Sequence, residues 1–93
     1  MAPAYTLVWT ETFARTAKRF LGRHPELRTT LAGILQKLET DPSHPSLKLH
    51  PLHGRLEGRQ AVRLTYSYRI ILRVEIRDRE IILLDIGFHD EVY

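Results

Sequence analysis

The sequence contains no cysteine, so it offers neither a disulfide framework nor a thiolate metal site. This composition suits a reducing compartment, and we expect a cytoplasmic protein. No apolar run approaches the roughly 20 residues that a helix needs to cross a bilayer. Residues 1–5 also lack the basic and apolar parts of a secretion signal. Export and membrane insertion are therefore not expected.

Internal repeats and low-complexity stretches are absent as well, and 93 residues with 43% hydrophobic content can supply one modest core. We expect a single domain over residues 1–93. Charge is distributed unevenly along it: residues 47–74 carry six basic side chains and one acid, whereas residues 75–93 carry two basic side chains and six acids. The basic segment either binds a polyanion or forms part of a solvated surface of mixed charge.

The first half of the chain predicts one strand and two helices. Residues 5–9 are rich in β-branched and aromatic residues, which is typical of a strand, and Trp9 at their end is expected in the core. Thr10 can cap a helix that ends at Gly22, and Pro25 suits the first position of a second helix. Both segments place apolar residues at helical spacing, namely Phe13, Ala17, Phe20 and Leu21, then Leu27, Leu31, Ile34, Leu35 and Leu38.

The second half predicts strands. Apolar and polar residues alternate through 60–65 and 69–76, and an apolar run follows at 81–84. The order is β-α-α-β-β-β, with room for one further strand. The expected class is α+β, with the two N-terminal helices packed on a twisted antiparallel sheet.

The turn between the two alternating segments decides which side chains are buried. A two-residue turn would place Arg69 and Arg73 among apolar side chains, which an unpaired charge does not tolerate. An odd turn such as residues 66–68 instead groups the apolar side chains against the helices, namely Val62, Leu64, Ile70, Leu72 and Val74. Arg63, Arg69 and Arg73 then share an open face, which is either solvated or able to hold an RNA backbone.

These residues carry a resemblance to a known family. The element order, the segments 62–64 and 68–71, and the ending 84–93 resemble the RelE/ParE toxin superfamily of type II toxin–antitoxin systems, over nearly the whole chain. The motif His50-Pro51-Leu52-His53-Gly54, followed by Gly58 and a Gly-x-His-x-x-x-aromatic ending, is most similar to the YafQ-like branch of RNA-cutting toxins. The resemblance implies a toxin that cleaves mRNA, either free or on the ribosome, and stops translation.

The resemblance also implies site residues. In the YafQ-like branch, the histidine of the His-Pro-Leu motif and the histidine near the C-terminus belong to the active site, and they fall here on His50 and His89. The final aromatic residue matches Tyr93.

The two middle strands depart from the pattern of the branch. Arg63 and Ser67 replace its further histidine and aspartate, whereas Arg69 matches an arginine that is found more widely across RelE relatives. The site is therefore a hybrid of two patterns, and the assignment of acid and base stays open.

These residue types suit RNA cleavage without a metal or other cofactor. A base must take the proton of the 2′-OH, an acid must protonate the leaving 5′-oxygen, and cations must stabilise charge on the phosphate. Histidine can perform either proton transfer near neutral pH, and arginine grips phosphate oxygens. The expected catalytic residues are His50, His89, Arg63 and Arg69, and the expected substrate-binding residues are Tyr93, Arg73, His53, Tyr68 and Lys48.

A metal site is not expected, although the chain has five histidines. No His-Glu-x-x-His spacing occurs, and Pro51 prevents His50 and His53 from sharing one helical face.

Two other functions stay open: a ParE-like inhibitor of DNA gyrase without catalysis, and a decayed toxin that only binds its antitoxin. In each case the expected partner is an antitoxin whose acidic and apolar tail folds across the basic face of the sheet. The gyrase inhibitor would have no chemical need for His50, His89 and Tyr93.

Overall fold

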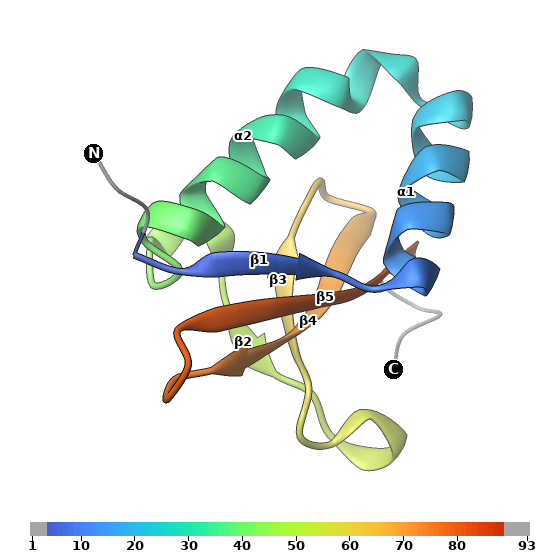
Figure 1. The fold of residues 1–93 in the computed structure, drawn as a ribbon. Coiled ribbons are helices and arrows are strands. Elements are labelled where there is room, and N and C mark those ends of the chain that lie inside the picture. The colour runs from blue at the N-terminus through green and yellow to red at the C-terminus, as the bar shows by residue number, and fades with distance from the viewer. Residues whose placement is uncertain (1–3, 89–93) are drawn as a thin grey trace.

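The computed structural model describes residues 4–88, in which two helices cover one face of a five-stranded sheet (Figure 1). The α-helices are α1 (Glu11–Arg23) and α2 (Arg28–Thr40), and short 3-10 helices form η1 (Pro25–Leu27), η2 (Pro45–Leu47) and η3 (Gly54–Leu56). The strands are β1 (Thr6–Trp9), β2 (His50–Pro51), β3 (Gln60–Arg63), β4 (Tyr68–Glu75) and β5 (Glu80–Phe88). The predicted α+β class is confirmed. In this part of the chain no helix has both the length and the apolar character that a membrane span requires.

The sheet has the strand order β1-β5-β4-β3-β2. The pairs β2–β3, β3–β4 and β4–β5 are antiparallel, as expected for a meander, but β1 lies parallel to β5. A parallel pair needs a long connection between its strands, and here both helices and the meander separate β1 from β5. The sheet is therefore mixed, with its single parallel pair at one edge.

The predicted cap at Thr10 forms and also ties α1 to the sheet. The Thr10 hydroxyl accepts a hydrogen bond from the backbone N–H of Phe13 (3.1 Å) and donates one to the carbonyl of Leu83 on β5 (2.8 Å). The predicted end of α1 at Gly22 is one residue early, because the helix continues to Arg23. Pro25 opens the short helix η1 instead of α2 itself, so α2 begins three residues later than expected.

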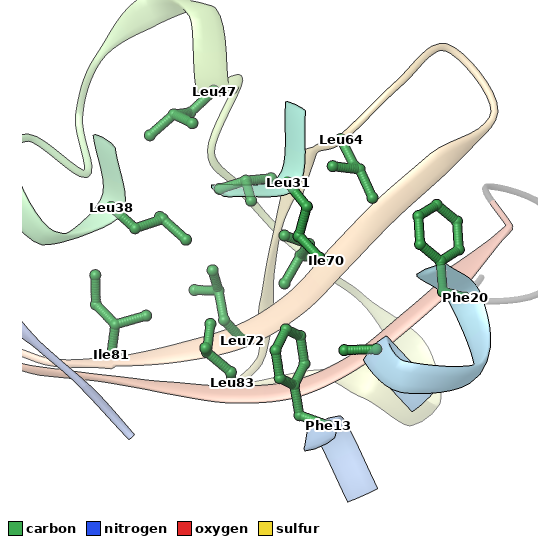
Figure 2. Close-up of a cluster of buried hydrophobic side chains, with 12 residues drawn as sticks. Phe13, Phe20, Leu31, Leu38, Leu47, Leu64, Ile70, Leu72, Ile81 and Leu83 are labelled. Carbon is green, nitrogen blue, oxygen red and sulfur yellow. The ribbon is translucent and has the colours of Figure 1, made fainter. Parts of the chain in front are cut away.

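The main core lies between the helices and the sheet (Figure 2). Its largest fully buried side chains come from α1, α2, η2 and three strands, namely Phe13, Leu38, Leu47, Val62, Ile70, Leu72, Ile81 and Leu83. Trp9 does not belong to it, contrary to expectation. Its side chain is 50% exposed and meets Phe13 edge-on, because Trp9 ends the edge strand β1.

An odd number of residues separates the paired positions of β3 and β4, as predicted, but the number is five and not the three of residues 66–68. Arg63 pairs with Arg69, so residues 64–68 lie between these two positions, and Val62 pairs with Ile70 on the helix side. Leu64 and Leu72 are buried there as well, whereas Val74 is only partly buried. The arginines therefore lie on the other face, which we call the outer face.

The outer face is more covered than expected. Arg69 and Ile71 are only 4% and 5% exposed. Ile71 belongs to a second apolar cluster with Leu52 and Ala61, against which Leu56 packs. The expectation of an open face is wrong at these two residues, and Ile71 is covered by Leu52 and Leu56 from the segment between β2 and β3.

Candidate active site

A pocket of about 280 Å³ opens on the outer face, where β2 and the β3–β4 hairpin meet. Its walls combine three cationic side chains, one imidazole, two phenol rings and a hydroxyl, contributed by Lys48, His50, Arg63, Thr65, Tyr66, Tyr68 and Arg69. The charged and aromatic groups come from segments up to 21 residues apart in the sequence, and the fold of the sheet brings them together.

His50 is oriented by the backbone just before it. Lys48 ends η2 in the left-handed region (φ 51°), and its carbonyl oxygen lies 2.7 Å from the His50 Nδ1. A carbonyl oxygen can only accept, so Nδ1 carries the proton in this hydrogen bond. In the neutral ring Nε2 is then the basic nitrogen, which is the state that a general base requires.

Arg63 and Arg69 face each other across the β3–β4 ladder. Like charges directly opposite each other destabilise a sheet, and a bound anion between them would offset that cost. Arg69 is buried, whereas Arg63 is exposed and lies over the ring of Tyr66, with 5.9 Å between its Cζ and the ring centroid. The hairpin turn is fixed by the Thr65 hydroxyl, which accepts hydrogen bonds from the backbone N–H groups of Ser67 and Tyr68, both at 3.2 Å.

Tyr68 is held in place on three sides. Its ring stacks on Phe88 with 4.4 Å between centroids and meets Phe20 edge-on at 4.8 Å. Its hydroxyl forms a hydrogen bond of 3.0 Å with the Nε2 of His24. His24 lies at the junction of α1 and η1, 44 residues away, and only the tertiary contact shows its connection to the pocket.

The pocket brings together five of the predicted site residues, namely Lys48, His50, Arg63, Tyr68 and Arg69. Thr65 and Tyr66 also line the pocket, although neither was predicted as a site residue. The signal for Thr65 was its place on the arginine side of the alternating strand, and the signal for Tyr66 was the tyrosine-rich turn.

Of the other four predicted residues, two lie away from the pocket and two fall outside the described residues. Arg73 lies farther along β4 and forms an ion pair with Glu75, with 3.0 Å between Nε and Oε1. His53 is exposed just before η3. His89 and Tyr93 lie outside the described residues.

Chemically, the pocket provides one proton-transfer group beside three fixed positive charges and two flat rings. Such a set can hold a phosphate group and the ring of a base next to it. Within residues 4–88, no group of three or more histidine, aspartate or glutamate side chains could hold a metal ion.

No protein-family model and no curated protein sequence matches this chain. Solved structures do match it over almost their whole length. YafQ from E. coli strain BL21(DE3) has a TM-score of 0.77 at 18% identity, covering 96% of this chain and 98% of that one. A YoeB/ParE toxin from Agrobacterium tumefaciens has a TM-score of 0.73 at 22% identity, covering 90% and 98%.

The match extends to a chain of the DinJ–YafQ toxin–antitoxin complex of E. coli, with a TM-score of 0.76 at 18% identity, over 97% of this chain and 98% of that one. A similar fold is thus found in toxins that share fewer than one residue in four with this chain. The protein therefore has the fold of the RelE/ParE toxins, with YafQ among the structures that it resembles.

Proposed function

We propose that this protein is the toxin of a type II toxin–antitoxin pair and that it inhibits translation by cutting mRNA without a metal ion. The fold supports the first part, because the similar YafQ was solved in complex with DinJ as toxin and antitoxin. A cognate antitoxin is accordingly the expected protein partner. The pocket on the outer face supports the second part.

The observation that carries the proposal is the position of His50 beside Arg63 and Arg69 in one pocket. The His50 Nδ1–H donates a hydrogen bond to the Lys48 carbonyl oxygen. The unprotonated Nε2 is then free to act as a base for the 2′-OH of a bound nucleotide. The 2′-oxygen then attacks the adjacent phosphorus, the bond to the 5′-oxygen breaks, and the products are a 2′,3′-cyclic phosphate and a free 5′-OH.

The cations of the pocket act on the phosphate. Arg69 is buried, where the effective dielectric constant is low and its charge acts strongly on a phosphate oxygen. Arg63 and Lys48 line the same pocket and are exposed enough to meet an incoming strand. The rings of Tyr66 and Tyr68 offer surfaces on which an unpaired base can stack.

His89 and Tyr93 complete the proposal. His89 is the candidate for the acid that protonates the leaving oxygen, and Tyr93 for a further stacking surface, both on the resemblance to the YafQ-like branch. Neither belongs to the described residues, so both roles are to be tested by mutagenesis.

The test is cleavage of mRNA in EDTA, with and without ribosomes. The parent protein should cut, and His50→Gln should cut about 10²- to 10⁴-fold more slowly, which is the usual effect of losing a general acid or base. His44→Asn is the matched control. His44 is exposed, and its Nδ1 accepts a hydrogen bond from the backbone N–H of Ser46 and lies 2.8 Å from the Ser46 hydroxyl. The side-chain oxygen of asparagine can also accept the bond from the N–H. Equal rates for the parent and His50→Gln would show that His50 is not the base.

The partner is tested separately by growth. Co-expression with the protein encoded beside this one should restore growth that the toxin stops. Growth inhibition by a parent protein that cuts no RNA in either assay would contradict the ribonuclease and favour the gyrase-type inhibitor.

A further inference from the structure

A second pocket, of about 360 Å³, lies between α1 and the adjoining ends of β4 and β5. Its lining includes two arginines of α1 and two stacked aromatic rings, namely Arg19, Arg23, Tyr68 and Phe88. Because Tyr68 also lines the first pocket, this one ring contributes to the walls of both.

The α1 side of the second pocket is strongly basic. Arg19 and Arg23 lie one helical turn apart, and neither forms an ion pair with any residue of the described range 4–88. The whole of α1 carries four basic side chains and a single acid, Glu11. Arg23 also favours the helix as a cation in its last turn, but that effect does not account for Arg19, one turn earlier.

The opposite side of the pocket offers an aromatic surface. Phe88 stacks on Tyr68 at an angle of 30° and remains 45% exposed. A ring that rests on a neighbour by one face and is nearly half exposed can accept a planar group on its other face. Two guanidinium groups beside such a ring match the two parts of a nucleotide, its phosphate and its base.

We infer that the second pocket is a subsite for a nucleotide next to the one that is cut, and that single-stranded RNA passes over Tyr68 from one pocket to the other. The inference rests on the proposed function, because it concerns the same RNA. Arg19 and Arg23 hold the phosphate of the neighbouring nucleotide, and Phe88 stacks on its base. Tyr68, fixed by Phe20 and His24, keeps the two subsites at a constant separation.

Binding is tested first with an oligonucleotide that cannot be cut, because each ribose carries hydrogen in place of the 2′-OH. The double variant Arg19→Gln/Arg23→Gln should bind it more weakly. The slope of log affinity against log salt should become shallower by about 0.7, the value for one phosphate on a single strand, because both arginines hold the same phosphate. Arg15→Gln is the matched control, since it removes the same charge from the same helix but does not line the pocket.

Cleavage is tested with RNA oligonucleotides lengthened by one nucleotide at a time. For the parent protein, the addition of one particular nucleotide should raise kcat/KM about tenfold, in the range expected for stacking of a single base. We call this increase the length-dependent step. That step should disappear in the arginine double variant and in Phe88→Leu, which keeps an apolar side chain without a ring. An abasic nucleotide at that position should abolish the step in the parent as well.

The outcomes separate the subsite from the proposed function. If the parent and Arg15→Gln bind alike, the arginine double variant binds with a shallower salt slope, and no RNA is cut, the subsite stands and the ribonuclease fails. If RNA is cut but the double variant and Phe88→Leu keep the length-dependent step and the salt slope, the subsite is wrong. Loss of antitoxin binding by the double variant with unchanged RNA binding would also overturn it, because this surface would then serve the antitoxin.

Discussion

The strands β3 and β4 contribute to both faces of the sheet, yet the two faces differ in charge and in the size of their apolar clusters. The helix side of β3 and β4 carries Val62, Ile70 and Leu72, all fully buried in the main core. The outer side carries Arg63 and Arg69 beside a smaller apolar cluster around Ile71. Because side chains alternate along a strand, each residue that stabilises the fold is followed by one that can meet a ligand. In this protein, stability and chemistry are thus assigned to opposite faces of one hairpin.

The largest expected effect comes from the outer face. Arg69→Gln should lower the rate of RNA cleavage about 10²- to 10³-fold, which is typical when a buried group that stabilises transition-state charge is lost. Arg73→Gln is the matched control on the same strand, where the arginine is exposed and paired with Glu75, and it should change the rate by less than about threefold. The measurement is the cleavage rate of each variant, after each has been shown to unfold cooperatively. Similar losses in both would mean that general positive charge, not the pocket, drives cleavage.

The next effect is on stability and comes from neighbouring residues of β4. Ile70→Ala should cost about 3–4 kcal/mol of unfolding free energy, because it leaves a cavity in the main core. Ile71→Ala should cost nearer 2 kcal/mol, since Ile71 packs in the smaller outer cluster, where the site can relax toward solvent. Urea denaturation of both variants measures the difference. An equal or larger cost at Ile71 would show that the outer cluster is as tightly packed as the main core.

A smaller effect on stability is expected where α1 is joined to the sheet through Thr10. Thr10→Ala removes the cap of α1 and the bond to the Leu83 carbonyl, and should cost about 1–2 kcal/mol. Thr12→Ala is the control, because Thr12 is exposed in the first turn of the same helix. The midpoints of thermal unfolding provide the measurement. If the two variants unfold at the same temperature, the cap does not contribute.

The smallest effect concerns Lys48 at the rim of the pocket. Lys48→Asn removes the charge and keeps a residue that tolerates the left-handed backbone at φ 51°, so the carbonyl that orients His50 stays in place. The salt slope of RNA binding should fall by about 0.7, the value for one phosphate contact on a single strand. Stability should change by less than about 0.5 kcal/mol. An unchanged salt slope would remove Lys48 from the binding surface.

The sequence alone was enough to predict the class, the element order and the face of the sheet on which each side chain of β3 and β4 lies. Helical spacing of apolar residues identified both helices, and the argument against burying Arg69 among apolar side chains set the turn between β3 and β4. The face of each strand residue follows from a local rule of period two, which needs no knowledge of the rest of the chain. The same rule placed Arg63 and Arg69 on one face, and the structure shows that they are paired across the ladder.

Only the tertiary structure decided how that face is used. It buried Arg69, brought His50 and Lys48 to the arginines, and joined Tyr68 to His24 over 44 residues. It also laid β1 parallel to β5 and left Trp9 half exposed. These features depend on which distant segments pack together. Periodicity fixes the direction of a side chain relative to its own strand, whereas the neighbour that it meets is set by the packing of the whole chain.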